Sequence, residues 1–511
     1  MLKPAVNKRR VLRLRLYHEV SIVFLFLCAA CAAWAGGPWF ATGVKVGEVT
    51  DTQAILWARL TRAAERVGVE GGLPKVLYRN ARTGELEESE QGRRDRAPVV
   101  EYPAGGSVET LEGAVPVAAG SVRVVYKADS STDWTTMEWA PVDAAKDYAR
   151  QIKLTGLTPA TLYEYRVQSR GPGMAEPAGL ITGSFRTAPA ADTEAKVTFA
   201  VTTCHEYAHL DAFGSGRAGA RPHLGFKIYP VMLALKPDFY VHTGDIVYYD
   251  KLAKTQALAR WHWQRIYSLP NAVEFHRFVP SYFMKDDHDT WMNDCFPGMK
   301  TRYMGEFTFE QGQAIFLEQV PIEPPAYRTF RWGKDVQVWL VEGRDYRSPN
   351  DIPDGPEKTI WGAEQKAWFK RTVDESDAAF RVLISPTPLV GPDRRNKNDN
   401  HSNKGFTHEG DELRQFLASR KNMVVLHGDR HWQYFSIDDE TGLHEYSCGA
   451  ASDEHAGGWD KEDFLPEHQY MRVVGGFLLV KVERRDGEPV MTLQHRDVDG
   501  EILNEDVFSG K

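Results

Sequence analysis

The chain has 511 residues, of which 42% are hydrophobic and 11% aromatic, values typical of a folded globular protein. This length exceeds what one ordinary hydrophobic core supports, so we expect two or three domains. The formal net charge of −8 argues against nucleic-acid binding as a primary role, because an acidic surface repels polyanions and leaves only local phosphate recognition.

Residues 1–35 have the pattern of an export signal. Basic residues over 8–15 precede an apolar run over 20–33, and Ala33-Trp34-Ala35 offers the small-x-small pattern of a cleavage site. The run is shorter than the roughly 20 residues that span a bilayer, which favours cleavage over an uncleaved anchor. We therefore predict an exported protein, periplasmic or secreted, with no stable membrane anchor. Arg9-Arg10 leaves the twin-arginine route open beside the Sec route.

Cysteine usage is sparse. Beyond residue 35 the cysteines are Cys204, Cys295 and Cys448, an odd number that makes a poor disulfide framework. At least one thiol stays free, and a disulfide between Cys295 and Cys448 remains open.

Residues 38–190 have an all-β pattern. Short, mostly alternating runs at 53–60, 122–126 and 162–167 are separated by Gly, Pro, Asp and Thr. The segment 154–165 is similar to the E–F corner of a fibronectin type III sandwich, tyrosines included. We expect a fibronectin type III-like N-terminal domain with a structural role, or one that helps to wall the active-site cleft.

The polar, small-residue segment 186–195 is the best domain boundary, and the pattern changes after it. Apolar strand-like runs then alternate with helical segments, which indicates a layered α/β domain over 195–511. The predicted strands are 197–203, 238–243, 278–283 and 423–426, the predicted helices are 227–235, 255–268, 364–373 and 412–420, and a closing hairpin pairs 477–482 with 490–495.

Four polar clusters carry the chemistry of this domain: 203–207, 244–249, 286–289 and 427–431. At least three of them follow a predicted strand directly, and side chains at successive strand ends of an α/β sheet converge on one crevice. The sequence therefore predicts one site rich in metal-ligand atoms.

The residue types in these clusters suit metal ions. The carboxylate of Asp245 can bridge two cations, and a tyrosinate at Tyr248 is a hard ligand that favours ferric iron. The three carboxylates of 286–289 surround His288 and repel one another, so their burial without a cation would be costly. Gly428 would let the backbone between His427 and His431 approach a ligand closely. Each cluster taken alone also has a plain reading as a solvated or structural turn.

In this order the four clusters resemble the PhoD-type alkaline phosphatases of the calcineurin-like metallophosphatase superfamily. Residues 40–60, 344–347 and 361–368 also look like landmarks of that family, and the resemblance covers nearly the whole chain after residue 35. The resemblance implies a four-layer αββα sandwich behind the N-terminal β-domain. It also implies hydrolysis of phosphate monoesters by a hydroxide that iron and calcium activate.

The resemblance assigns roles to individual residues. Cys204, Tyr248 and His431 would bind Fe³⁺, and Asp245 would bridge it to one or more Ca²⁺ ions. Asp287 and Asp429 would also hold calcium. These six residues are the predicted metal ligands.

The predicted catalytic side chains complete this assignment. His288 is the candidate general acid for the leaving oxygen, oriented by Asp289 or Asp286. Arg344, Arg347 or Arg430 would clamp a phosphate oxygen pair, since a guanidinium fits that geometry; the plain alternative for each arginine is a structural ion pair. Asp289 departs from the family, which more often has Glu there.

Two alternatives stay open. A phosphodiesterase acting on cell-wall polymers or phospholipid head groups would use the same metal site. An exported binding protein with a decayed hydrolase domain belongs to another class, but it would have lost ligand positions that this chain keeps. The sequence leaves the oligomeric state and the number of calcium ions open.

Overall fold

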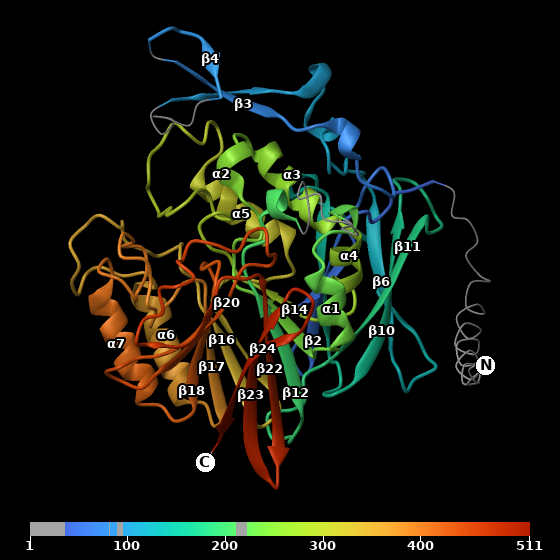
Figure 1. Ribbon diagram of the computed structural model, residues 1–511. Coiled ribbons are helices and arrows are strands. Elements are labelled where there is room, and N and C mark those ends of the chain that lie inside the picture. The colour runs from blue at the N-terminus through green and yellow to red at the C-terminus, as the bar shows by residue number, and fades with distance from the viewer. Residues whose placement is uncertain (1–35, 81, 89–95, 211–221, 511) are drawn as a thin grey trace, which may run out of the picture. The chain divides into compact units, whose positions relative to one another are not determined.

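Two large β-sheets stack face to face, with helices on both outer sides (Figure 1). The computed structural model describes residues 36–80, 82–88, 96–210 and 222–510. The predicted export signal, 1–35, lies outside these described residues.

The first large sheet has nine strands in the order β24-β23-β22-β12-β13-β14-β1-β2-β9. Their bounds are β1 Val44–Gly47, β2 Gln53–Arg59, β9 Ala149–Thr155, β12 Val197–Thr202, β13 Phe239–His242, β14 Ser281–Phe283, β22 Gly476–Arg485, β23 Glu488–Asp497 and β24 Ile502–Ser509. The four central strands β12, β13, β14 and β1 run parallel, and the flanking pairs are antiparallel.

The second large sheet has seven strands in the order β15-β16-β17-β18-β20-β19-β21. Their bounds are β15 Arg328–Trp332, β16 Val336–Leu340, β17 Phe380–Ser385, β18 Met423–His427, β19 Gln433–Ile437, β20 His444–Cys448 and β21 His468–Arg472. Phe199 and Val241 of the first sheet share one buried cluster with Val338, Val382 and Leu426 of the second. This cluster is the core between the two sheets.

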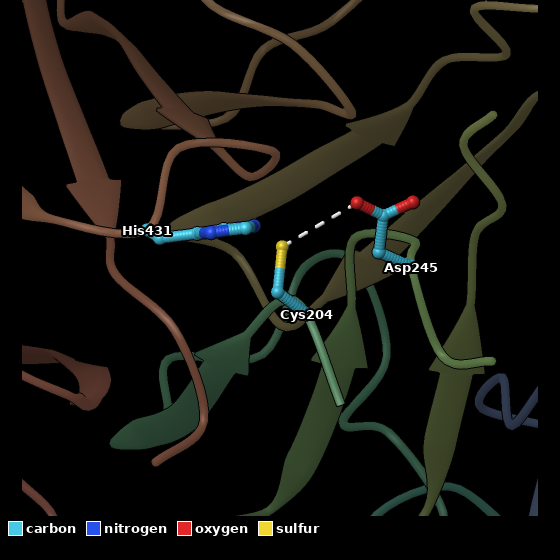
Figure 2. A group of neighbouring side chains, drawn as sticks. All are labelled: Cys204, Asp245 and His431. Atoms are coloured by element: carbon cyan, nitrogen blue, oxygen red, sulfur yellow. Dashed lines mark hydrogen bonds between the residues drawn. The ribbon is translucent and has the colours of Figure 1, made fainter. Parts of the chain in front are cut away.

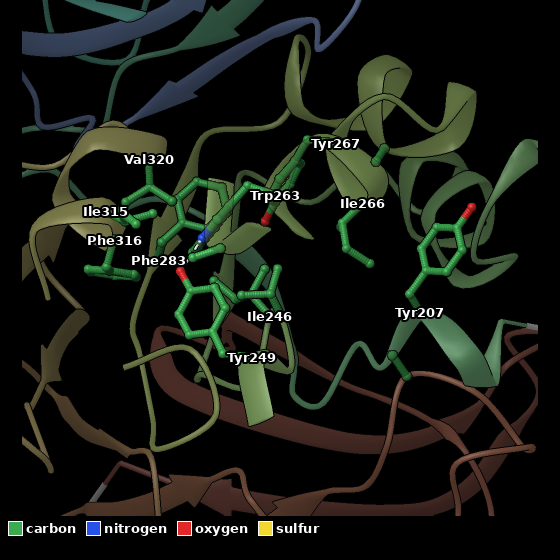
Figure 3. Packing of buried hydrophobic residues seen from close by; sticks show 14 of the residues in the cluster. Tyr207, Ile246, Tyr249, Trp263, Ile266, Tyr267, Phe283, Ile315, Phe316 and Val320 are labelled. Carbon is green, nitrogen blue, oxygen red and sulfur yellow. Dashed lines mark hydrogen bonds between the residues drawn. The ribbon is translucent and has the colours of Figure 1, made fainter. Parts of the chain in front are cut away.

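Helices cover the outer faces. The nine-stranded sheet carries α1 Ile228–Ala234, α2 Tyr249–Leu252, α3 Gln256–Tyr267, α4 Pro270–His276 and α5 Phe309–Gln319, and the seven-stranded sheet carries α6 Gly362–Asp374 and α7 Thr407–Ala418. Figure 3 shows the first helical layer, where Trp263 and Phe316 join Phe283 of β14 in one buried cluster. The predicted αββα arrangement is confirmed.

Both faces of each large sheet are covered at these strands, which explains the uninterrupted apolar runs. All six residues of β12 and all five of β18 are buried. Continuous hydrophobic strands are typical of sheets enclosed on both sides, whereas a half-exposed strand alternates.

The N-terminal strands build a second β-sandwich, and one of its two sheets is the nine-stranded sheet described above. Strands β6 Ser121–Ala128, β7 Thr135–Thr136, β8 Ala140–Pro141, β10 Leu162–Arg170 and β11 Gly179–Arg186 form a separate sheet. Its core side chains, among them Val124 and Tyr165, pack against Val46 and Leu56 of the nine-stranded sheet. The backbone N–H of Thr158 donates to the Tyr163 hydroxyl at 2.8 Å, the contact that defines a tyrosine corner.

A small sheet completes the fold. It consists of β3 Lys75–Arg79, β4 Leu86–Glu87 and β5 Pro98–Glu101. Strand β3 contacts α2, and Figure 1 shows the small sheet beside that helix. A segment that precedes the metal-rich region by more than 100 residues in sequence therefore lies next to it.

The predicted closing hairpin is present as β22 and β23. It continues into a third strand, β24, which sequence reasoning missed. The disulfide between Cys295 and Cys448 does not form, because both side chains are free and buried in different parts of the core. Among the described residues, no helix combines the length and the apolar character that crossing a membrane requires.

The shared sheet predicts cooperative unfolding. Because β1 pairs directly with β14, the N-terminal sandwich cannot unfold without exposing the edge of β14 and its buried neighbours. We expect one calorimetric transition for the chain 36–511, with calorimetric and van't Hoff enthalpies that agree. Two separate transitions, one of them lost on deleting 36–190, would contradict this expectation.

Candidate metal centre

The candidate site lies where the strands end. Cys204 follows β12 by two residues, Asp245 follows β13 by three and Asp286 follows β14 by three. Because β12, β13 and β14 run parallel, their carboxyl ends meet at one edge. The second sheet reaches the same edge, since the backbone N–H of Asp429 donates to the Thr203 hydroxyl at 3.2 Å.

Ligand atoms converge at this edge in three overlapping groups. Cys204, Asp245 and His431 place their ligand atoms within 4.8 Å of one another, and Figure 2 shows the three side chains facing one point. The same spacing holds for Asp245 with Asp287 and His288, and for Asp245 with Asp286 and Asp429. Asp245 belongs to every group, which is the position that a bridging carboxylate requires.

Tyr248 completes the first group. Its hydroxyl donates to Asp245 Oδ2 at 3.3 Å and lies 3.4 Å from His431 Nε2, while Cys204 Sγ lies 3.5 Å from the same carboxylate oxygen. The structure thus brings all six predicted ligand residues together.

The backbone is unusual at three of these residues. Cys204, Asp245 and Asp429 have φ values of 56°, 58° and 63°, in the left-handed region that side chains other than glycine rarely adopt. Such conformations cost of order 1–3 kcal/mol each and cluster at functional sites. A Cβ atom at Gly428 would collide with the hydroxyl of Thr243. Only glycine therefore fits where the backbone before Asp429 passes the segment after β13.

The carboxylates repel one another in the absence of a cation. Burial raises the pKa of Asp245 well above its usual value, and the neighbouring carboxylates of the Asp286–Asp289 segment add to the shift. Burial likewise raises the pKa of Asp286 to about 8 and that of Asp289 to about 7. Asp286 Oδ2 is buried without a hydrogen-bond donor. A cation at this point would satisfy this oxygen, so the donor set fits metal ions.

Burial also shifts the pKa values of the sulfur, phenol and imidazole donors. Burial raises the pKa of Cys204 and of Tyr248, with Asp245 adding to both shifts, and burial lowers the pKa of His431. A neutral imidazole is ready to ligate, whereas the thiol and the phenol need a cation to ionise. The thiolate and the imidazole are the softer donors of the set, and the phenolate and the carboxylates are the hard ones.

Two of the three candidate arginines lie behind the carboxylates. Arg344 Nε donates to Asp286 and Arg344 Nη2 lies 3.8 Å from Asp287. Arg430 Nη1 lies 2.6 Å from Asp429 Oδ2, and Arg430 Nη2 donates to Asp393 at 2.6 Å. Both guanidinium groups are fully buried and neither lines the cavity described next. Their geometry is that of groups that hold carboxylates in place, the ion-pair alternative, and not of an open phosphate clamp.

A cavity of about 350 Å³ opens in front of the ligand groups. It is lined by Glu206, Tyr248, Asp250, Lys251, His288, Met292, Asn293, Tyr303, His431 and His455. Burial lowers the pKa of His288, but Asp250, Asp287 and Asp245 outweigh burial and raise it well above the usual value. A protonated His288 therefore faces this cavity.

Sequence reasoning missed the partner of His288. The ring nitrogen Nδ1 lies 2.6 Å from Asp250 Oδ1, whereas Asp289 accepts hydrogen bonds from the backbone of Asp286 and Ile246. The expected orienting role of Asp289 or Asp286 is thus taken by Asp250. The only sequence signal was the position of Asp250 two residues after Tyr248.

His455 was also missed. Its ring centroid lies 3.9 Å from that of His431, and its Nδ1 lies 3.2 Å from the carbonyl oxygen of Cys204. It comes from the loop between β20 and β21, where no strand pattern or motif pointed to it.

The fold and the donor set define a class, that of two-sheet αββα proteins with a cluster of potential metal ligands at one edge of the sheets. The sequence models of the PhoD-like phosphatase family and of the N-terminal domain of PhoD-like phosphatases match residues 199–469 and 27–189. The chain belongs to the PhoD-like phosphatase family.

Individual relatives agree with this assignment. Alkaline phosphatase D of Bacillus subtilis (strain 168) is 23% identical over 340 residues, 56% of this chain and 53% of that protein, so the match spans about half the length of the relative. A structure of PhoD superposes with a TM-score of 0.67 at 17% identity, over 93% of this chain and 90% of that one. Purple acid phosphatase from yellow lupin (Lupinus luteus) seeds gives 0.57 at 11% identity, over 91% and 74%. The two structural likenesses show the shared fold.

The raised pKa values predict how metal removal changes stability. A carboxyl whose folded pKa exceeds its unfolded value of about 3.9 stabilises the fold below that value, and the stabilisation is lost as pH rises through the folded pKa. For Asp429, Asp289 and Asp286 the folded values are about 6, about 7 and about 8. The chelator-treated protein should therefore lose melting temperature progressively between about pH 4 and about pH 8, by several degrees.

Thermal unfolding in chelator and in added Ca²⁺ checks this. Added Ca²⁺ should reduce the decline of melting temperature with pH, because the cation replaces the protons bound to these carboxyl groups. Asp286→Asn should flatten it without calcium, since one titrating carboxyl is gone. An unchanged slope in both cases would contradict the electrostatic account.

Proposed function

We propose that this chain is an exported, metal-dependent phosphoesterase that hydrolyses phosphate monoesters. One observation carries the proposal: Asp245 belongs to three groups of potential metal ligands, one of them with Cys204 and His431, next to a cavity that His288 and His431 line. Membership of the PhoD-like phosphatase family supports the same reaction class.

The donor set supports a mixed metal centre. We assign Fe³⁺ to the group of Cys204, Tyr248 and His431, because thiolate and tyrosinate suit that ion. We assign Ca²⁺ to the carboxylates of Asp287 and Asp429, with Asp245 between the two kinds of ion. When bound, the metals would neutralise phosphoryl charge and make hydroxide available near neutral pH.

We assign the transfer of the leaving-group proton to His288. Asp250 fixes its ring through Nδ1, which leaves Nε2 as the other proton-bearing atom of the imidazolium. The ring stacks on Tyr248 with centroids 4.3 Å apart, so it has little rotational freedom. His288 thus acts as general acid, and Asp250 is a positioning residue for it.

Arg344 and Arg430 serve the reaction indirectly. Each neutralises part of the carboxylate cluster from behind and fixes the direction of Asp286 or Asp429. Without the two guanidinium groups, the free-energy cost of burying the acidic side chains would be higher. We assign them positioning roles.

Asp245→Asn tests the bridging role. The substitution keeps the side-chain shape and removes the negative charge, so we expect a loss of turnover of about 100-fold or more with an unchanged circular dichroism spectrum. Turnover of p-nitrophenyl phosphate and of bis-p-nitrophenyl phosphate by chain 36–511 measures the effect and the monoester preference together. Asp377→Asn, at a side chain 91% exposed, is the matched control and should keep full activity. Retention of more than a few per cent of activity by Asp245→Asn would refute the bridging assignment.

Cys204→Ser tests the identity of the first metal. Serine is a weaker ligand for this ion in the neutral form, so the iron content measured by plasma mass spectrometry should fall while calcium is retained. The visible absorption expected of ferric tyrosinate and thiolate ligation should be lost with it. The buried Cys448→Ser, outside the ligand groups, is the control. An active wild-type protein without iron would overturn the assignment of Cys204 and Tyr248 to Fe³⁺.

A further inference from the structure

His455 contacts both of the segments that supply the ligands proposed for iron. Cys204 follows β12 of the nine-stranded sheet by two residues, and His431 follows β18 of the seven-stranded sheet by four. Their ligand atoms lie within 4.8 Å of each other (Figure 2). The loop between β20 and β21 carries His455 and reaches both segments.

The first contact is a hydrogen bond to the backbone of Cys204. His455 Nδ1 lies 3.2 Å from the Cys204 carbonyl oxygen, and since a carbonyl oxygen only accepts, Nδ1 carries the proton and donates it. The backbone N–H of Ala451, in the same loop, donates to this oxygen at 3.4 Å. Cys204 has a φ of 56°, which is unfavourable for a cysteine. The two donors therefore help to hold the backbone that directs the thiol into the site.

The second contact restrains His431. The ring centroids of His455 and His431 lie 3.9 Å apart. The backbone N–H of Gly457 donates to the His431 carbonyl oxygen at 3.0 Å. Residues 455–457 therefore hold both the ring and the backbone of this ligand, and a ring packed so closely has few rotamers open to it.

His455 is itself fixed in place. Its side chain is only 7% exposed, and its Nε2 lies 3.7 Å from Glu206 Oε2. Glu206 in turn accepts a hydrogen bond from Lys251 Nζ at 2.8 Å. The ring also meets Tyr248 edge to face, with 5.4 Å between the centroids. Because one ring nitrogen faces a carbonyl oxygen and the other a carboxylate, the orientation of the imidazole is set on both sides.

His455 acts on ligands and is not one of them. None of the three groups of potential metal ligands found among the described residues contains it. In metal sites, side chains outside the ligand set orient the ligands, and their replacement typically lowers metal affinity or activity by about 10- to 100-fold. His455 has this position at two ligands at once.

We propose that His455 is a positioning residue that holds Cys204 and His431 in the geometry that binds iron. The hydrogen bond to the Cys204 carbonyl and the ring contact with His431 carry this role. The inference rests on the proposed assignment of Fe³⁺ to this group. It makes the loop between β20 and β21 a part of the metal centre, although none of the four polar clusters includes that loop.

Three substitutions separate the two contacts. His455→Asn keeps an N–H donor near the position of Nδ1 and removes the ring. His455→Phe keeps a ring beside His431 and removes the donor, and His455→Ala removes both. We expect the iron affinity of chain 36–511, measured by competition with a chelator, to fall about 10- to 100-fold in the alanine variant and less in the other two.

The visible absorption of the bound iron reports on the geometry of its ligands. We expect the band to shift in His455→Phe and His455→Ala, because the Cys204 carbonyl loses its side-chain donor and the thiolate is free to turn. His455→Asn should keep the band near that of the wild type. The calcium content should stay unchanged in all three variants, since the two contacts involve no carboxylate that we assign to calcium.

His495→Phe is the matched control. His495 is a fully buried histidine whose Nε2 lies 3.0 Å from the carbonyl oxygen of Tyr434, and it belongs to none of the ligand groups. The substitution removes a hydrogen bond of the same kind, so it should lower the melting temperature without changing the iron affinity or the band. If His455→Ala does not fold, the comparison of His455→Asn with His455→Phe decides the test.

Two results would overturn the inference. One is an iron affinity and a band like those of the wild type in all three variants at His455. The other is an equal loss of iron in His455→Asn and His455→Phe with an unshifted band, which would show that the side chain supports the fold alone.

Failure of the proposed function would look different. A wild type that binds iron but hydrolyses no phosphomonoester would contradict the phosphoesterase only, because the iron measurements need no turnover. A wild type that binds no iron would contradict the iron assignment, and Co²⁺ then serves as the probe, through its thiolate absorption. Weaker Co²⁺ binding and a shifted band in His455→Phe but not in His455→Asn would support the positioning role, and identical behaviour of the two variants would overturn it.

Discussion

Mutual repulsion among buried acidic side chains is the constraint on which the rest of this structure depends. Asp245, Asp286 and Asp289 are essentially inaccessible to water, and each has a raised pKa because burial disfavours its charge. Because water does not reach them, either protons or nearby cations must balance their charge. Arg344 and Arg430 supply permanent positive charge from behind, and the proposed metal ions supply the remainder from the open side.

The scaffold holds these groups against that repulsion. Cys204, Asp245 and Asp429 adopt left-handed backbone conformations just after strands. At these points the two large sheets and the core between them hold the chain in place. The shared sheet extends this support into the N-terminal half, because β1 pairs with β14 just before the acidic segment begins. The N-terminal region thus supports β14 through β1 and lines a second cavity beside the site through β3.

Sequence reasoning identified the candidate ligand residues that the structure brings together, and it missed the residues that contact them. Ligand residues sit together in short motifs after apolar strands, and the β–α alternation and continuous apolar runs indicated the enclosed sheets. Asp250 and His455 are single residues whose roles arise only when separate segments meet. Arg344 is a different case: its residue type suggested a phosphate contact or an ion pair, and the structure buries it against Asp286.

The sequence by itself determined the layered α/β class, the all-β N-terminal half and the four clusters at strand ends, because hydrophobic period and residue type are local properties. Only the tertiary structure decided that β1, β2 and β9 join the nine-stranded sheet, that β24 extends it and that Cys295 and Cys448 stay apart. It also decided which side chains face the cavity and that β3 meets Lys251 there. Strand order and side-chain exposure depend on contacts between residues far apart in the chain, which no local pattern encodes.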